Sequence, residues 1–347
     1  MIDSAADHPD MAPYHHIVPR FYLAQFADLK MIQRVELQYG TTRKKSVKSV
    51  GGLQGFYSVP ETEDPEIFER ELFGAIENKA APIFKKIIHE DYWPLIPEDR
   101  AIVANFLAIQ FLRGNDRRTE QSEMKTSLGR LQTAANGPDA VRDELKELTS
   151  KEGVTLDFDE VWNERVGPDT KVEATAAEHM KLLVRSLPEA IDCFAGRPWM
   201  LVPFNRKHLL TCDSPVSLAP HPEDSPFMGV GLATAYRILF PISRQFGLLL
   251  TTPNEETPGE DLEKSTIKIW SGNADEKLTP TARLARQFNE LSIANARENI
   301  FHHPDDGDLV PDPLPQPRTQ EMQADGLEEL IAELNAQGGL AQGHDEE

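Results

Sequence analysis

Apolar residues recur every three to four positions along two stretches in the first third of the chain. In residues 66–90 this spacing predicts an amphipathic helix, and Asp64 and Pro65 just ahead of it suit a helix start. A second helix is predicted from Pro97 to about Leu112. Its almost wholly apolar centre indicates burial on most sides. These two helices are therefore expected to contribute much of the core.

The middle of the chain is charged and is followed by a β-type pattern. Residues 134–170, broken by Gly and Pro, predict a charged helical insertion facing solvent, and residues 171–193 predict a further amphipathic helix. In residues 198–252, apolar runs separated by turn residues predict a small, mostly antiparallel sheet with the order of a meander. A last long helix is expected from residue 279 to about 299.

These elements define an α+β fold with a helix-rich core and additional short strands near the N-terminus. Residues 1–13 are interpreted as a flexible leader, and residues 14–303 as a single α+β domain. Residues 304–347 are rich in Pro and acidic side chains and predict a disordered acidic tail. Within this tail, residues 326–335 predict a short amphipathic helix, which is a candidate docking site for a protein partner if the chain is a sensing or interaction protein.

The charge of the chain restricts its partners. The formal net charge is -21, and the tail holds twelve Asp and Glu against one Arg, which is -11 and leaves -10 for the remainder. A body of that charge disfavours non-specific coating by nucleic acid. It leaves room for local basic clefts, and the two basic runs are also consistent with solvated surfaces. These runs comprise Arg43, Lys44, Lys45 and Lys48, and Arg113, Arg117 and Arg118.

Several functional classes lack their sequence signals. The two cysteines, Cys193 and Cys212, form no disulfide framework or metal-type spacing. The N-terminus has no signal-peptide pattern and no run is long and apolar enough for a membrane helix, so a cytoplasmic location is expected. The chain has no Walker loop, GxGxxG, GxSxG, HExxH or paired CxxC. Enzymes without a short motif are not excluded.

Polar residues within the predicted buried helix give the first indication of a site. Gln110, Arg113 and Arg117 lie at positions i, i+3 and i+7 and so share one helix face. A buried amide or guanidinium needs partners, and carboxylates or an anionic ligand suit an arginine. Glu69 and Glu77 on the preceding helix are the expected carboxylates. The same arrangement is consistent with a structural salt-bridge network.

Two further segments carry candidate chemistry. His15 and His16 are adjacent in a segment expected to be extended, so their side chains point to opposite faces and one can enter a site as base or metal ligand. Asp213 follows a predicted strand and precedes Ser214 and Pro215, a position typical of site carboxylates and also of ordinary turns. His302 and His303 are interpreted as capping the last long helix.

The chain resembles the bacterial, fungal and viral proteins grouped as the domain of unknown function 4238 family, over about residues 14–301. The matching motifs are His15 to Phe26, Ile76 to Pro82, Gln110 to Arg113 with Arg117, Thr211 to Val216 and Phe240 to Ser243. This chain has Cys212 and Ser214 where the family tends to have a small residue and Asn. The resemblance implies a set of site residues and no particular reaction.

Three functions follow from these residues. The first is a hydrolase, a metal-assisted phosphodiesterase or nuclease-like enzyme. Its catalytic residues are His15, His16, Glu77 and Asp213, its divalent metal is held by Glu69, Glu77 and Asp213, and its substrate is bound by Gln110, Arg113 and Arg117. The second is a non-catalytic protein of defence or regulation that senses a small anion, a nucleotide or a nucleic-acid end in an arginine-rich pocket. In the third, the polar set is a buried network that fixes the fold.

Overall fold

A computed structural model of the chain describes residues 13–59, 64–223, 229–253, 262–317 and 326–340. The chain divides into two compact units. The first comprises residues 1–115 and 176–319, and the second comprises residues 116–175 and 320–347. The predicted leader lies almost entirely outside the described residues, and so do residues 318–325 and 341–347 of the predicted tail.

The α+β class predicted from the sequence is confirmed. The α-helices are α1 Arg20–Leu23, α2 Gly74–His89, α3 Pro97–Leu112, α4 Asn115–Glu152, α5 Phe158–Val166, α6 Ala176–Ala195, α8 Leu262–Trp270, α9 Ala282–Asn295 and α10 Leu327–Gln337. The strands are β1 Tyr14–His16, β2 Met31–Glu36, β3 Thr41–Ser46, β4 Gly52–Gln54, β5 Trp199–Pro203, β6 Thr211–Cys212, β7 Ser217–Ala219, β8 Arg237–Ser243, β9 Phe246–Leu250, β10 Glu276–Lys277 and β11 Asn299–His302. Short 3₁₀ turns link some of these elements.

The two helices predicted first are present in the first unit. Helix α3 has the predicted bounds, with Pro97 at its first position, where the missing N–H of proline costs no hydrogen bond. Helix α2 is preceded by a π-helical segment, Phe68–Phe73, so the predicted stretch is helical with a change of winding. The apolar centre of α3 is buried, as its composition indicated.

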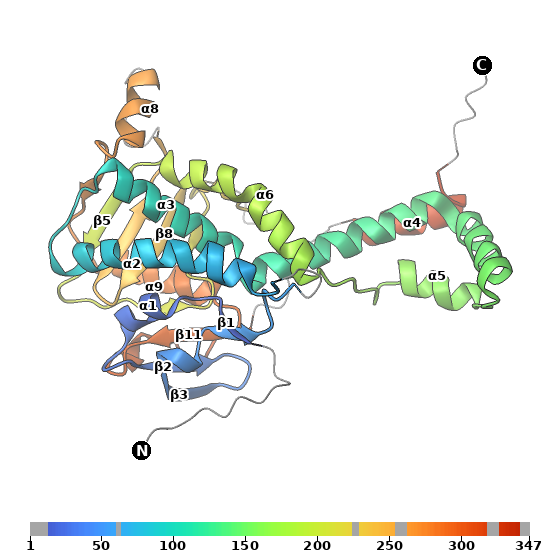
Figure 1. The fold of residues 1–347 in the computed structure, drawn as a ribbon, viewed down its shortest axis with the longest axis horizontal. Coiled ribbons are helices and arrows are strands. Elements are labelled where there is room, and N and C mark those ends of the chain that lie inside the picture. Colours follow the sequence, from blue (N-terminus) through green and yellow to red (C-terminus); the bar gives the residue numbers. More distant parts are fainter. Residues whose placement is uncertain (1–12, 60–63, 224–228, 254–261, 318–325, 341–347) are drawn as a thin grey trace. The chain divides into compact units, whose positions relative to one another are not determined.

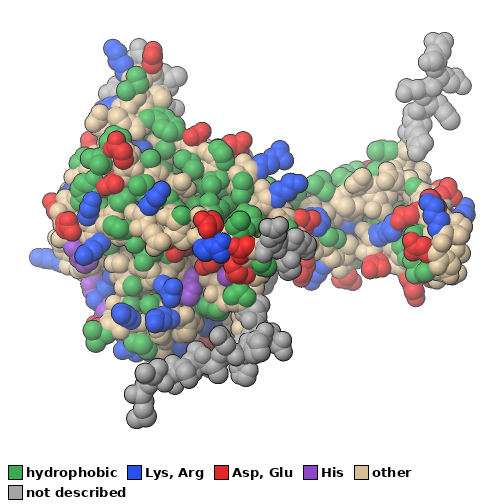
Figure 2. Space-filling view, viewed as in Figure 1, with side chains coloured by type: hydrophobic (Ala, Val, Ile, Leu, Met, Phe, Trp, Pro, Cys, Tyr) green, Lys and Arg blue, Asp and Glu red, His purple; other side chains and the backbone are tan. Residues whose placement is uncertain are grey.

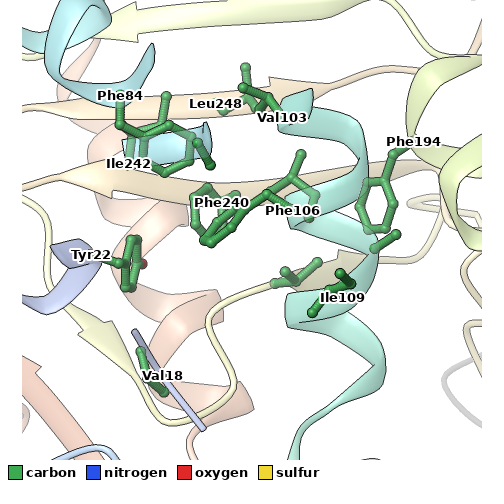
Figure 3. Close-up of a cluster of buried hydrophobic side chains, with 14 of the residues drawn as sticks. Val18, Tyr22, Phe84, Val103, Phe106, Ile109, Phe194, Phe240, Ile242 and Leu248 are labelled. Carbon is green, nitrogen blue, oxygen red and sulfur yellow. The ribbon is translucent and has the colours of Figure 1, made fainter. Parts of the chain in front are cut away.

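A five-stranded sheet in the order β10-β5-β9-β8-β7 carries helices on both faces. Alternation along β9 directs Leu248 towards Val103 of α3, whereas a side chain at Gly247 would meet Phe288 of α9 on the other face. Figure 1 shows α2, α3 and α6 over one face of this sheet. Figure 3 shows the aromatic centre of the core between α3 and β8, where the Phe106 and Phe240 rings lie 6.2 Å apart.

A separate four-stranded sheet in the order β3-β2-β11-β6 corrects two predictions. Strand β6 pairs with β11, and β5 pairs with β9, so the predicted meander does not run in sequence order. His302 ends strand β11 and does not cap a helix, because α9 ends at Asn295. The strand pairings that form this sheet join residues far apart in the chain, and the local periodicity of the sequence does not reveal such pairings.

A short antiparallel ribbon of β1 and β4 holds the opening motif in the first unit. Tyr14 pairs with Gln54 and His16 with Gly52, and the Val18 N–H donates to the Gly51 carbonyl at 2.8 Å. The left-handed backbone at Gly51, with φ of 72°, allows this close turn. The extended opening segment is therefore fixed by main-chain pairing as well as by Pro19.

The second unit consists of helices from two distant parts of the chain (Figure 1). Helix α4 breaks at Gly137, where φ is 79°. Ile331 and Leu334 of α10 are buried against Ala134 of α4 and Val166 at the end of α5. The predicted tail helix thus packs on the predicted insertion of the same chain.

The first part of the predicted tail is also ordered, which corrects the expectation of disorder from residue 304. Asp306 is buried and its carboxylate accepts hydrogen bonds from the Arg244 guanidinium at 2.7 Å. Leu309, Val310 and Leu314 pack on a small apolar cluster that includes Val35 and Ile300. Three apolar side chains among acids and prolines are enough to anchor this segment to the four-stranded sheet. Within the described ranges, no helix has both the length and the apolar content to cross a membrane.

Candidate functional site

The two adjacent histidines of β1 have opposite environments, as their alternation along a strand predicted. His15 is buried, and its Nδ1 accepts from the Tyr57 N–H at 3.0 Å while its Nε2 contacts the Glu66 carboxylate. Because Nδ1 is an acceptor, the proton of the neutral ring is on Nε2 and is donated to Glu66. Both ring nitrogens of His15 are therefore used within the fold.

His16 lies on the other face of β1, edge-to-face with Tyr14 at 5.1 Å between ring centroids. Burial and, to a smaller extent, the charge of Arg20 lower the pKa of His16 to about 4. Its Nε2 is buried and has no hydrogen-bond partner among the described residues. His16 is thus a neutral, half-buried ring at neutral pH.

Arg113 is the centre of a buried network at the end of α3. Its Nη1 donates to Glu77 at 2.7 Å and its Nη2 donates to the Gln110 side chain at 2.9 Å. The Gln110 amide in turn donates to the Ile17 carbonyl at 3.2 Å, which joins α3 to the opening motif. The structure therefore brings together three of the predicted residues, Glu77, Gln110 and Arg113.

The network of Arg113 is connected to the His15 pair through aromatic residues. The Tyr57 hydroxyl donates to the Arg113 carbonyl at 3.1 Å, and the Tyr57 ring lies 5.5 Å from the His15 ring. The guanidinium of Arg113 lies 5.3 Å from the centre of the Phe73 ring. A guanidinium that donates two hydrogen bonds and contacts an aromatic ring is typical of an arginine with a structural role.

Glu69 is close enough to this network to be influenced by its charges. Burial raises the pKa of Glu69, and the positive charge of Arg113 opposes that rise. Its Oε2 is buried without a hydrogen-bond partner among the described residues. Glu69 and Glu77 both approach Arg113, as the sequence predicted, although only Glu77 bonds it directly.

Besides His16, Arg117 and Asp213 lie outside this network. Arg117 pairs with Asp116 at 3.2 Å and Glu120 at 2.7 Å within α4, in the second unit. Asp213 follows β6 and accepts from the backbone N–H groups of residues 297, 298 and 299, each at 2.8 Å. The Asp213 carboxylate therefore fixes the turn that leads into β11.

The surroundings of Asp213 shift its titration. Burial raises the pKa of Asp213 to about 6, and the three N–H donors oppose that rise. Across the described part of the chain, no three His, Cys, Asp or Glu side chains form a group that could hold a metal ion. Glu69, Glu77 and Asp213, the predicted metal ligands, are thus not gathered into such a group.

A pocket of about 120 Å³ lies between the opening motif and the turn that Asp213 fixes. It is lined by Tyr14, Ile17, Val18, Arg34, Gly51, Gly52, Leu53, Asn115, Asp213, Ser214, Arg297, Glu298 and Asn299. Two of these residues, Arg34 and Arg297, are cationic, and Asn115 and Ser214 are neutral and polar. The lining comes from six segments of the sequence, which span residues 14 to 299.

Hydrogen bonds orient two of the pocket's polar side chains. The Arg34 Nε donates to the Asn299 side-chain oxygen at 2.8 Å, and an Arg34 Nη contacts Glu36. The Tyr14 hydroxyl accepts from the Gly52 N–H at 3.0 Å, which leaves its own proton to donate. Burial raises the pKa of Tyr14, so this hydroxyl stays protonated at neutral pH.

Sequence reasoning found Asp213 and the opening motif but missed the two arginines of the pocket. Arg34 lies in strand β2, where polar and apolar residues are equal in number, so it has no distinctive local signal. Arg297 follows α9 and gives no local signal of its own. Its position in the pocket depends on the pairing of β11 with β2 and β6.

Both polar sites lie within one matched region. Residues 14–306 match the family described as Protein of unknown function (DUF4238). The chain belongs to the DUF4238 family. This region includes every residue of the Arg113 network and of the pocket. No curated protein and no solved structure matches the chain.

Proposed function

We propose that this DUF4238 protein binds a small anion in the pocket beneath the opening motif, as a ligand-sensing protein. The observation that supports this proposal best is the pair of arginines, Arg34 and Arg297, in one small polar pocket. Guanidinium groups bind phosphate, sulfate and carboxylate groups with directed, charge-assisted hydrogen bonds. A volume of about 120 Å³ suits one such group and not a large organic ligand.

The pocket has the rigidity that a binding site needs. Asp213 holds the backbone of residues 297–299 through three N–H bonds, and Asn299 in turn holds Arg34. A site whose donors are already oriented loses little conformational entropy when the ligand binds. The lining also contains two acidic residues, Asp213 and Glu298, whose carboxylates repel an anion. We therefore expect the ligand to contact the arginines and not the carboxylates.

The Arg113 network fits a structural role better than a catalytic one. Arg113, Gln110 and the two nitrogens of His15 are used in hydrogen bonds within the fold. A general base needs a lone pair directed towards the substrate, and His15 has none left. We propose that this network fixes the opening motif on α3 and so supports the floor of the neighbouring pocket.

The test is calorimetric titration of the full chain with sulfate at low ionic strength and pH 7. The substitution Arg34→Gln removes one charge-assisted hydrogen-bond donor, and we expect it to weaken the affinity for sulfate at least tenfold. Lys44→Gln is the matched control, because it removes one charge from the same hairpin. Gln33, the cross-strand partner of Lys44, lies on the opposite sheet face from Arg34. Equal affinities for the two variants would overturn the proposal.

A phosphodiesterase is the second candidate function, favoured by a carboxyl group with a pKa of about 6 beside two arginines. In this proposal Asp213 exchanges a proton with the substrate while the arginines bind its phosphate. A divalent metal and a cytoplasmic setting belong to the same proposal. Hydrolysis of bis(p-nitrophenyl) phosphate, with and without Mg²⁺ or Mn²⁺, tests it. A rate that is unchanged by Arg34→Gln would reject this pocket as the active site.

A further inference from the structure

The hairpin of β2 and β3 carries a concentrated positive charge. Residues 30–48 contain six Lys and Arg and one acidic residue, a net charge of +5, although the whole chain carries -21. Figure 2 shows these side chains gathered in the lower part of the view, where β2 and β3 lie in Figure 1. A positively charged region on a protein of negative net charge is expected where a polyanion binds.

The strand register places this charge beside the pocket. Arg34 of β2 lies directly opposite Arg43 of β3, and Lys45 is two residues further along the same sheet face. Directly opposed like charges destabilise a strand pair. The carboxylate of the hairpin, Glu36, pairs with Arg34, and among the described residues Arg43 and Lys45 form no ion pair. Glu36 offsets the charge of Arg34, and a bound polyanion would neutralise the charges of Arg43 and Lys45.

Two exposed tyrosines flank these cations. Tyr14 lines the pocket and is 40% exposed, and Tyr39 in the β2–β3 turn is 67% exposed. Exposed aromatic rings among basic side chains are the usual surface for single-stranded nucleic acid, because bases stack on the rings while phosphates contact the cations. An acidic peptide uses only the cations and leaves the rings without a role.

We propose that the pocket binds the terminal phosphate of a single-stranded nucleic acid, whose next nucleotides lie across the β2–β3 hairpin. This inference rests on the proposed anion-binding function and names its ligand class. The pocket accepts one phosphate group, Arg43 and Lys45 contact the following phosphates, and Tyr39 stacks on a base. The small volume of the pocket selects an end of the strand over an internal position.

The test is fluorescence anisotropy of the full chain with a 3′-labelled deoxythymidine 10-mer that carries either a 5′-phosphate or a 5′-hydroxyl. We expect the 5′-phosphorylated strand to bind at least tenfold more tightly. A second titration uses a 5′-labelled strand with either a 3′-phosphate or a 3′-hydroxyl, and comparison of the two titrations identifies which end of the strand is bound. Equal binding of phosphorylated and unphosphorylated strands in both formats would overturn the proposal.

Variants separate the hairpin from the pocket. In Arg43→Gln/Lys45→Gln, we expect binding of the phosphorylated strand to weaken about tenfold. The slope of log K against log salt should become shallower by about 1.4, because two phosphate contacts are lost. Sulfate affinity should be unchanged. Tyr39→Ala should weaken strand binding about fivefold or more, and Lys44→Gln on the opposite face should weaken it least.

The remaining outcomes distinguish the two proposals. Sulfate binding without strand binding would overturn the nucleic-acid inference and leave the anion pocket in place. Loss of both would overturn both. Competition by deca-glutamate as strong as that by the phosphorylated 10-mer would show that charge alone is recognised, and it would also overturn the inference. If the basic residues serve only to protect an edge strand from pairing, no probe binds the hairpin.

Discussion

Arg113 shows how a single side chain organises the first unit. Its guanidinium is buried, donates to Glu77 and Gln110, and lies against the Phe73 ring. The planar fork of arginine meets two acceptors at once, whereas lysine presents a single point charge. This residue therefore joins α2, α3 and, through Gln110, the opening motif.

We expect Arg113→Lys to lower the free energy of unfolding by about 2 kcal/mol, since one of the two buried acceptors loses its donor. Urea unfolding followed by tryptophan fluorescence measures this change. Arg117→Lys is the control, because Arg117 and its partner Glu120 are partly exposed, and it should change stability by less than about 0.5 kcal/mol. Similar values for the two variants would contradict the anchoring role of Arg113.

Asp213 gives the pocket a dependence on pH. Because burial raises the pKa of Asp213 to about 6, its carboxyl becomes neutral as the pH falls through that value. The fold favours the protonated form, so this group's contribution to stability falls as pH rises from about 4 to about 6. The same protonation removes a negative charge from the pocket.

Sulfate binding should therefore strengthen roughly fivefold between pH 7.5 and pH 5, as the repulsion from Asp213 disappears. Sulfate keeps its charge over this range, and His16, with a pKa of about 4, stays mostly neutral. Titration calorimetry at several pH values measures the effect. An affinity that stays constant or falls towards pH 5 would show that Asp213 does not face the bound anion.

At the scale of elements, the β1–β4 ribbon determines the shape of the pocket. Its two strands come so close at Gly52 that a side chain there would lie 2.2 Å from the His15 carbonyl oxygen and 2.8 Å from the Tyr14 ring. Only glycine permits this approach. The ribbon in turn supplies Tyr14, Gly52 and Leu53 to the pocket lining.

Gly52→Ala should separate the ribbon strands, lower the free energy of unfolding by about 2–3 kcal/mol and weaken sulfate binding. Gly307→Ala is the control within the same unit, because its added methyl group would meet no atom within 4 Å. Urea unfolding and calorimetry measure both properties. Unchanged sulfate affinity in a folded Gly52→Ala protein would exclude the ribbon as a wall of the binding site.

At the level of the whole molecule, the chain divides into two units, and helix α10 contributes to the packing of the second. The Arg130 guanidinium donates to both oxygens of the Glu328 carboxylate, at 2.7 and 2.8 Å, and Ile331 and Leu334 cover Ala134 and Val166. These contacts lie entirely within the second unit. Helix α10 is therefore part of the packing of α4 and α5.

A chain that ends at residue 319 should lose hydrogen-exchange protection in α4 and α5, since the apolar face covered by α10 becomes exposed. Protection of α2, α3 and the five-stranded sheet should remain within about twofold of the full chain. Glu328→Gln, whose side chain is 61% exposed, should have a much smaller effect. Uniform loss of protection across both units would mean that they do not unfold separately.

Elements with strong local signals could be predicted from the amino-acid sequence alone. The bounds of α3 follow from an apolar run and a proline at its first position, and the pairing of Arg113 with Glu77 follows from helix spacing and the need to satisfy a buried guanidinium. The opposite environments of His15 and His16 follow from strand alternation. Each of these inferences depends on residues within a few turns or on one pair of adjacent helices.

The contacts between distant segments could not be predicted from the sequence and became visible in the folded chain. The pairing of β11 with β2 and β6 places Arg297 and Asn299 beside Arg34, and it makes Asp213 the anchor of a turn more than eighty residues later. Hydrophobic periodicity reports which face of an element is buried but not which element covers it. Strand pairing depends on long-range packing, so the pocket arises from the fold and not from any single motif.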